Sequence, residues 1–295
     1  MHRPFRFGVV ISNAPSRTAF VTLARRAEEL GYATLLMPDR TITGLAPLTA
    51  LAVAAEATTS LRIGSYVFCN DYRHPALLAK EVATLDFLSG GRFELGLGAG
   101  VGPFDYQQLG LPFDKGDERV DRFEEALSVI KKFLTEESVN FSGKHYTITG
   151  MKGLPRPTQK PHPPIAIGGA GKRMLSLAAR EADSISIIFE LSPQGIDADN
   201  EGLEQKLMWM REAAGERFAC LELSQLAYVL AIDDGHADRD FEGEGPPLPR
   251  IVMSAGQVIE HLLEQRERYD FSYIPVYGGA QMENFAPVVA RLAGK

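Results

Sequence analysis

Short apolar stretches rich in β-branched residues recur along this chain about every thirty residues, the length of one βαβ unit. In the first third of the chain they cover residues 7–12, 34–38, 61–68 and 93–98. The segments between them place apolar residues three and four positions apart, which is typical of a helix with one buried face. Since the strands are apolar nearly throughout and alternate with helices, the pattern predicts a parallel sheet buried on both faces.

Helix boundaries are marked by residues with special backbone requirements. Ser16 or Thr18 is expected to cap the first helix, and Gly31 is expected to end it. Pro47 and Pro75 are each expected in the first turn of a helix, because the missing N–H costs no hydrogen bond there.

The second half of the chain brings the count of expected strands to eight. A helix near 117–134 is followed by a short extended excursion over 141–148 and by a proline-rich surface segment over 154–164. The signal weakens over the variable segment 191–250, in which residues 233–249 are expected to be an acidic loop. The remaining elements are expected in this order: a strand over 164–169, a helix after it, a strand over 183–189, a helix near 200–214, a strand over 222–232, a helix over 255–269, a strand over 271–276 and a helix near 282–292.

Length and charge narrow the class of protein. A chain of 295 residues suits one (β/α)8 TIM barrel, which usually needs about 250 residues, so we expect an α/β protein with a single domain over residues 1–295. The net charge of −7, without a basic stripe, argues against nucleic acid or an anionic membrane as partner. No apolar run reaches the roughly 18 residues that span a bilayer, and the first strand begins too near Met1 for an export signal, so a cytoplasmic location is expected. The six histidines and two cysteines show no metal-binding spacing, so no metal is expected.

Candidate chemistry gathers where strands end, because active sites of parallel barrels are built from the loops at the carboxyl ends of the strands. The strand over 93–98 runs into a GxGxG sequence, in which Gly96, Gly98 and Gly100 leave room for a flat ring or an anion to approach the backbone. The sequence IGGAGKR over 167–173 offers free backbone N–H groups, a helix amino terminus and two cations, which suit a phosphate. Each segment is also compatible with an ordinary tight turn.

Polar and aromatic side chains follow the same strand ends. Asp39 and Arg40 either contact a ring edge or a substrate, or pair with each other. Cys69 is expected to be a buried, unreactive thiol, and Arg119 and Arg122 are expected on a solvated helix face. Three tyrosines either pack at the rim or stack on a ring: Tyr66, Tyr72 and Tyr106.

The order of several motifs resembles that of a known family. The sequence HPALLAKEVATLDFLSGGRFELGLGAG is followed by DYQQLGLPFDKGDERVDRFEEALSVIKKFL, by FSGKHYTI and by PRPTQKPHPPIAIGG. Together, residues 5–188 resemble the bacterial luciferase-like superfamily of flavin and deazaflavin oxidoreductases, and within it the actinobacterial enzymes that use the deazaflavin coenzyme F420. The likeness fades over residues 191–250, where substrate-shaping segments of that superfamily vary.

The resemblance implies a TIM barrel, commonly a homodimer, with the isoalloxazine-like ring of the cofactor in the barrel mouth. It implies a cis peptide bond between Tyr66 and Val67, in a bulge that supports the ring. The family's backbone contacts to the cofactor map to Gly98 and Gly100. Its phosphate-binding loop maps to Gly168, Gly169, Ala170 and Gly171.

Two departures from the family pattern bear on the reaction. Related sugar-phosphate and alcohol dehydrogenases carry an Asp-His pair after the second strand, whereas this chain has Asp39 and Arg40. The dehydrogenase subgroup also carries a glutamate after the glycines of the fourth strand, where this chain has Val101. Both missing groups would accept a proton during alcohol oxidation, so the sequence argues against that reaction.

The sequence therefore predicts an oxidoreductase that delivers hydride from reduced F420 to an electron-poor acceptor such as an enone or an imine. Arg40 would polarise the oxygen of the acceptor, Asp39 would contact the cofactor or substrate, and one of the three tyrosines would donate a proton. Lys172 and Arg173 would hold the cofactor phosphate.

Other functions remain open at this point. The first is an FMN-dependent monooxygenase that uses dioxygen and flavin reduced by a separate reductase. The second is a non-redox, phosphate-binding TIM barrel with aldol or isomerase chemistry, although the lysine or paired acids that such chemistry needs are not seen after strands two to six. The third is a flavin-binding barrel without turnover.

Overall fold

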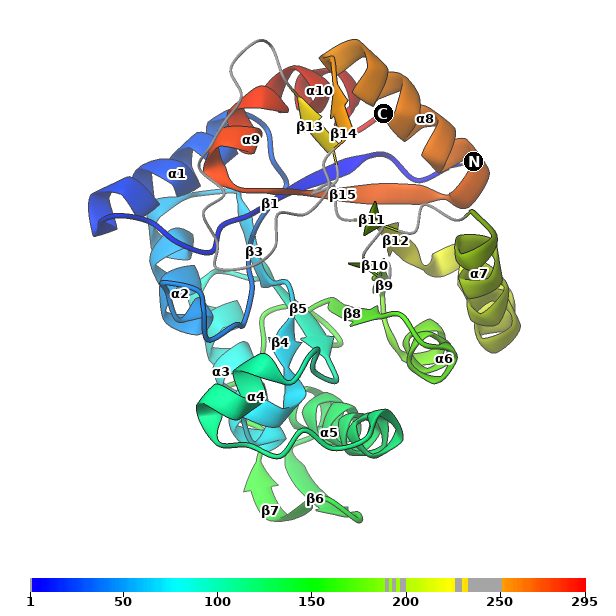
Figure 1. Ribbon diagram of the computed structural model, residues 1–295. Coiled ribbons are helices and arrows are strands. Elements are labelled where there is room, and N and C mark those ends of the chain that lie inside the picture. Colours follow the sequence, from blue (N-terminus) through cyan, green and yellow to red (C-terminus); the bar gives the residue numbers. More distant parts are fainter. Residues whose placement is uncertain (1, 189–190, 193–194, 197–199, 226–229, 233–250) are drawn as a thin grey trace.

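Eight parallel strands of the protein close into a barrel (Figure 1). The computed structural model describes residues 2–188, 191–192, 195–196, 200–225, 230–232 and 251–295, and the predicted loop over 233–249 lies outside them. Each of these strands pairs in parallel with the next along the chain, and pairing of the last with the first completes the ring, so the predicted α/β TIM barrel is confirmed. The strands are β1 (Arg6–Val10), β2 (Thr34–Met37), β3 (Arg62–Ser65), β5 (Phe93–Gly98), β8 (Ile165–Gly169), β9 (Ser184–Ile187), β12 (Glu222–Ser224) and β15 (Phe271–Tyr277).

Helices cover the outside of the barrel (Figure 1) and mostly begin where the sequence predicts. The Ser16 side chain accepts a hydrogen bond from the Ala19 N–H, and Gly31 follows the helix with a φ of +81°. Pro47 and Pro75 are the first residues of their helices. None of the described helices is both long and apolar enough to cross a bilayer. The helices between barrel strands include α1 (Arg17–Glu29), α2 (Pro47–Ala57), α3 (Pro75–Leu88), α5 (Gly116–Thr135), α6 (Lys172–Glu181), α7 (Asn200–Ala214) and α8 (Ala255–Tyr269).

Several segments differ in detail from the prediction. The expected extended excursion is an antiparallel hairpin of β6 (Ser138–Ser142) and β7 (Thr147–Lys152), which projects beyond α5 (Figure 1). The expected last helix starts earlier and is divided into α9 (Gly279–Asn284) and α10 (Ala286–Leu292). Helix α4 (Phe104–Leu109) was not expected, because six residues carry too little periodicity to be recognised.

The expected strand over 222–232 is not one element. Its first residues form β12 in the barrel, whereas β13 (Leu230–Ile232) pairs with β14 (Ile251–Met253) in a separate two-stranded sheet. The remaining short elements are β4 (Phe68–Cys69), the 3₁₀ helices η1 (Asn70–Tyr72) and η2 (Gly215–Cys220), and the strands β10 (Leu191–Ser192) and β11 (Gly195–Ile196).

Paired charges close the amino-terminal end of the barrel. Arg6 lies 2.6 Å from Glu94 and 2.9 Å from Glu222, and Arg62 also pairs with Glu94. Arg6, Arg62 and Glu222 are the first residues of their strands, so this cluster lies at the end away from the strand-terminal loops. Ligand chemistry is therefore to be sought at the opposite, carboxyl end.

Candidate active site

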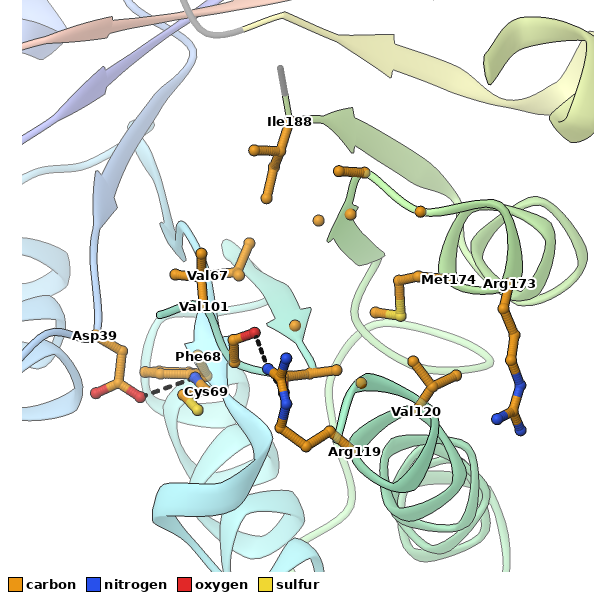
Figure 2. Close-up of a pocket in the computed structure, with 18 of the residues that line it drawn as sticks. Asp39, Val67, Phe68, Cys69, Val101, Arg119, Val120, Arg173, Met174 and Ile188 are labelled. Atoms are coloured by element: carbon orange, nitrogen blue, oxygen red, sulfur yellow. Dashed lines mark hydrogen bonds between the residues drawn. The ribbon is translucent and has the colours of Figure 1, made fainter. Parts of the chain in front are cut away.

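A cavity of about 500 Å³ lies at the carboxyl ends of the barrel strands (Figure 2). Loops after β2, β4, β5 and β8 form its walls, together with the first turns of α5 and α6. Its volume is within the range of roughly 300–1,000 Å³ that is usual for cofactor and small-ligand sites. It brings together most of the predicted site residues: Asp39, Arg40, Val67, Gly98, Gly100, Gly168, Gly169, Ala170, Gly171 and Lys172.

Val67 forms an apolar platform in this cavity (Figure 2). The peptide bond between Tyr66 and Val67 is cis, which confirms the expectation from the family resemblance. A Cβ added to Gly98 would lie 2.9 Å from Val67 Cγ2, and one added to Gly168 would lie 3.5 Å from the same atom. The glycines therefore let the Val67 side chain pack directly against the backbone of β5 and β8 at the cavity wall.

The first turn of α6 offers an anion-binding surface. Gly171 is the N-cap residue and has no side chain to cap the first N–H groups of the helix. A Cβ at Gly171 would meet nothing within 4 Å, so a ligand can approach the backbone. Lys172 is exposed and has no carboxylate partner among the described residues; its ammonium lies 6.0 Å from the centre of the Trp209 ring. The helix dipole and the lysine together favour a phosphate or a carboxylate.

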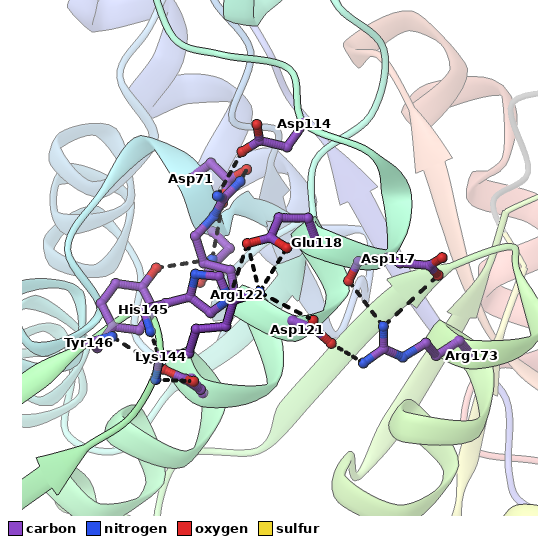
Figure 3. A network of polar contacts seen from close by, with 12 residues as sticks. Asp71, Asp114, Asp117, Glu118, Asp121, Arg122, Lys144, His145, Tyr146 and Arg173 are labelled. Atoms are coloured by element: carbon purple, nitrogen blue, oxygen red, sulfur yellow. Dashed lines mark hydrogen bonds and ion pairs between the residues drawn. The ribbon is translucent and has the colours of Figure 1, made fainter.

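Arg173 does not fit the predicted phosphate-binding role. Its guanidinium reaches α5, where Nη1 donates to the carbonyl oxygen of Asp117 at 3.0 Å and Nη2 pairs with the Asp121 carboxylate (Figure 3). These contacts compensate its charge within the protein, which leaves Lys172 as the cation of the predicted loop that is available to a ligand.

Asp39 and Arg40 do not pair with each other. Both oxygens of Asp39 accept from Arg73, at 2.5 and 2.9 Å, and Oδ2 also accepts from the Cys69 N–H at 3.0 Å (Figure 2). Asp39 therefore fixes the end of β4, and its carboxylate is already neutralised. Burial raises the pKa of the Cys69 thiol, in agreement with the expected unreactive group.

Arg40 is held at the cavity wall by a buried carboxylate. Its Nε donates to Asp105 Oδ2 at 2.6 Å, and Asp105 is fully buried. Burial acts to raise the pKa of Asp105, but hydrogen bonds from Thr41 and the charge of Arg40 outweigh it and lower that pKa. The Nη groups of Arg40 find no acceptor in the described part of the chain, so they can serve a ligand.

Of the three candidate tyrosines, Tyr72 lines the cavity. Tyr106 is fully buried, and its hydroxyl donates to Asp71 Oδ2 at 2.8 Å, so the expected role as proton donor does not fit its position. The Tyr66 hydroxyl contacts Ser186 Oγ, and Ser186 pairs in register with Gly168 of the cavity wall, so the expected role of Tyr66 stays a prediction.

Arg122 is 20% exposed and forms an ion pair with the buried carboxylate of Asp71, so the expected solvated helix face was wrong. Its Nε and Nη2 donate to the two oxygens of Asp71 at 2.8 and 2.7 Å, and Nη1 donates to Asp114 at 2.8 Å (Figure 3). Burial acts to raise the pKa of Asp71, but hydrogen bonds from Arg122 and Tyr106 outweigh it and lower that pKa. The pair joins α5 to η1, directly after β4, and so fixes one cavity wall.

Arg119 also departs from the expected surface position. It lines the cavity, and its Nη1 donates to the carbonyl oxygens of Ala99 and Gly100 at 3.1 and 2.5 Å (Figure 2). Its guanidinium lies over the Phe113 ring, 4.2 Å from the centre. The signal that the sequence offered was an arginine in the first turn of the helix that follows a glycine-rich strand end.

One group of potential metal ligands occurs among the described residues: Glu118 and Asp121 of α5 with His145 of the β6–β7 turn. Lys144 Nζ lies 2.9 Å from Glu118, and Arg173 pairs with Asp121 (Figure 3). Because two cations of the protein already compensate these carboxylates, the group is explained as part of a surface ion-pair network.

Fold and cavity together define a class, a TIM-barrel protein with a cofactor-sized cavity at the carboxyl ends of its strands. Residues 3–217 match the family model described as luciferase-like monooxygenase, and the chain belongs to this family. The resemblance seen in the sequence is thereby confirmed.

Relatives in the family differ in cofactor. The chain is 29% identical over 187 residues to the FMNH2-dependent dimethylsulfone monooxygenase of Pseudomonas putida, a match that covers 60% of this chain and 51% of that protein. It is 32% identical over 171 residues to the F420-dependent glucose-6-phosphate dehydrogenase of Amycolatopsis mediterranei, covering 55% and 51%. The matched region thus spans about half the length of either relative.

A solved structure extends the likeness in fold to nearly the whole chain. The coenzyme F420-dependent tetrahydromethanopterin reductase from Methanopyrus kandleri superposes with a TM-score of 0.80, over 98% of this chain and 99% of that one, at 18% identity. At that identity the match establishes the shared barrel and nothing about the substrate.

Proposed function

We propose that this protein is an oxidoreductase that transfers hydride between coenzyme F420 and a small, electron-poor organic substrate. The cavity is the main support, because it combines an apolar platform at Val67, glycine-rich strand ends and an open helix terminus beside Lys172. A flat ring with an anionic tail requires these three features together. When bound, F420 supplies the hydride donor or acceptor, and the remaining work falls to the residues of this chain.

The ring and the tail of the cofactor would bind to different parts of the cavity. The ring would lie against Val67 and contact the backbone at Gly98 and Gly100, while the tail phosphate would accept from the N–H groups between Gly168 and Lys172. F420 is preferred to FMN because the sequence resembles the actinobacterial F420 enzymes and because an F420-dependent relative is 32% identical.

Arg40 would orient the substrate. Asp105 holds its Nε, so its Nη groups are presented to the cavity in a fixed position. A guanidinium in that position donates hydrogen bonds to a carbonyl oxygen and stabilises the negative charge that forms there during reduction. It cannot act as a general base at neutral pH, which is consistent with reduction rather than alcohol oxidation.

Tyr72 would be the proton donor. Burial raises the pKa of its hydroxyl, with further contributions from Cys69, Asp105 and Asp39, so the hydroxyl stays protonated at neutral pH. Its ring packs edge-on against Tyr106, with ring centres 5.6 Å apart, which limits its movement.

The cofactor assignment is tested by titrating the purified protein with F420 and with FMN, in oxidised and reduced forms, and following fluorescence. We expect tighter binding of F420. Tight binding of FMN with no binding of F420 would reject the assignment. Arg40→Ala and Tyr72→Phe should then lower turnover much more than they lower F420 affinity, whereas equal losses of both would contradict the assigned roles.

An FMN-dependent monooxygenase is the second candidate, because the relative at 29% identity is an FMNH2-dependent monooxygenase. Oxygen consumption with reduced FMN and a panel of aldehydes, sulfones or amines would support it. The absence of consumption with all of them would count against it.

We also propose that the protein acts as a homodimer joined through α3. Leu77, Phe87 and Leu88 of this helix are 59%, 60% and 69% exposed, and Leu77 and Leu88 lie on the same helical face, about three turns apart. Several exposed large apolar side chains on one helix are compatible with a protein interface.

A further inference from the structure

The cations that line the cavity differ in whether the protein compensates their charge. Arg40 pairs with Asp105, and Arg173 pairs with Asp121. Arg119 and Lys172 have no carboxylate partner among the residues that the structure describes. The cavity therefore carries two uncompensated positive charges, although the chain as a whole has a net charge of −7.

Arg119 is oriented by neutral groups alone. Nη1 donates to the carbonyl oxygens of Ala99 and Gly100, and Nε donates to the Asp114 carbonyl oxygen at 3.2 Å. Its guanidinium also stacks over Phe113, at 4.2 Å from the ring centre. These contacts fix its position but leave its full charge, and the Nη2 group has no acceptor in the described residues.

A partly buried guanidinium that is fixed but not neutralised suits an anionic ligand, because a ligand anion restores the compensation that the protein omits. Arg119 and Lys172 come from the first turns of different helices, α5 and α6, and both first turns line the same cavity. An elongated ligand with a charged tail can therefore meet both.

We propose that Arg119 is a charge-selecting residue of this cavity, whose guanidinium binds a phosphate or carboxylate oxygen on the tail of the cofactor. The proposal rests on the proposed function in assuming a cofactor with a ribityl tail, and it holds equally for F420 and FMN. It deepens that function by assigning the discrimination between charged and neutral forms of the cofactor to one side chain.

A merely structural role predicts a different behaviour. If Arg119 only clamps the loop after β5 through Ala99 and Gly100, its loss should weaken charged and neutral ligands by the same factor. Arg119→Gln is the sharpest variant, because the amide group can still donate to a carbonyl oxygen while the charge is gone. Arg173→Gln is the matched control, since Arg173 lines the same cavity with its charge already paired.

The experiment measures dissociation constants by fluorescence titration for matched pairs of ligands. FMN is compared with riboflavin, and F420 with its deazariboflavin core, which lacks the phosphate and carboxylates. We expect Arg119→Gln to weaken FMN or F420 about tenfold or more, as for the loss of a charge-assisted hydrogen bond, and the neutral partner by less than about twofold. Arg173→Gln should leave both members of each pair nearly unchanged. If Arg119→Gln loses affinity for F420 but not for FMN, the contact lies at the tail carboxylates of F420. If it loses affinity for both, the contact lies at the phosphate.

Equal weakening of the charged and neutral ligands, or no weakening of either, would overturn the proposal. If Arg119→Gln does not fold by circular dichroism, the salt dependence of binding is measured in Lys172→Gln, in which Arg119 is the remaining uncompensated cation of the described cavity. Salt-sensitive binding of FMN beside salt-insensitive binding of riboflavin supports charge selection by Arg119, and equal salt sensitivity for both ligands overturns it. Binding of FMN without F420 would reject the proposed cofactor and leave the Arg119 comparison intact.

Discussion

Replacing Arg122 with methionine should cost the protein more stability than any surface arginine would. The side chain of Asp71 is 6% exposed, and Arg122 supplies two of its hydrogen bonds at 2.7 and 2.8 Å. Methionine fills a similar volume and removes the cation, so an ionised carboxylate would remain buried without a partner charge. Breaking one side of a buried pair typically costs about 3–5 kcal/mol.

The lower end of that range is expected here, because Tyr106 and Asn70 still donate to Asp71, at 2.8 and 3.2 Å. For a chain of 295 residues the unfolding entropy is about 0.6 kcal/mol/K, so a loss of about 3 kcal/mol lowers the melting temperature by about 5 °C. The pKa of Asp71 in the folded protein lies below its usual 3.8, so the pair contributes stability above that pH and loses it as the pH falls through the lowered value. The difference between variant and unmodified protein should therefore shrink in acid.

Urea denaturation at neutral pH and again well below pH 3.8 measures both effects. Arg173→Met is the control, because its pair with Asp121 is exposed, at 45% and 39%, and should contribute no more than about 1 kcal/mol. A loss below about 1 kcal/mol for Arg122→Met, or a loss equal to that of the control, would refute the inference that a buried charge is left unpaired.

Gly98→Val should abolish cofactor binding, because a Cβ there already lies 2.9 Å from Val67 Cγ2. Gly256→Ala in α8, outside the cavity lining, enters open space and should bind normally; equal affinities of the two variants in a fluorescence titration would contradict the platform. Glu28→Gln should destabilise the protein at neutral pH but not near pH 2. Burial acts to raise the pKa of Glu28, but hydrogen bonds from the backbone after α2 outweigh it and lower the pKa from 4.5 to about 2, so this stability is present above pH 4.5 and is lost as the pH falls through about 2. Denaturation midpoints that differ by a constant amount across that range would count against this. Leu88→Asp should convert the proposed dimer to a monomer in light scattering, and an unchanged mass would show that α3 is not the interface.

Features governed by local sequence were predictable. Ser16, Gly31, Pro47 and Pro75 mark helix ends through requirements of their own backbone and side chain, and the apolar strands follow from their composition. The position of the cavity also followed, because a parallel barrel places all its strand-terminal loops at one end. The bulge with the cis bond before Val67 was reached through the family resemblance and not from the residues alone.

Ion pairs and hydrogen bonds between residues far apart in the sequence were not predictable. Asp71 and Arg122 are 51 positions apart, and Arg40 and Asp105 are 65 apart, so no local pattern indicates that they meet. An arginine on a helix that is otherwise rich in charge is expected to be solvated, and only the packing of α5 against the loop after β4 shows that Arg122 is 20% exposed and paired with a buried carboxylate. The same reason explains why Tyr106 looked available as a donor although its hydroxyl is committed to Asp71.

The cations around this cavity fall into two groups, those paired with a carboxylate of the protein and those left for a ligand. Arg73 and Arg122 are each matched by a carboxylate of the protein, so their charges hold the walls together. Arg119 and Lys172 are not matched in the described residues, so these two cations are available to a ligand although the protein is acidic. Since fields act over about 8–10 Å at physiological salt, a ligand in the cavity responds to these two groups and not to the net charge. Net charge thus bears on large polyanionic partners, but it carries no information about a small anionic cofactor.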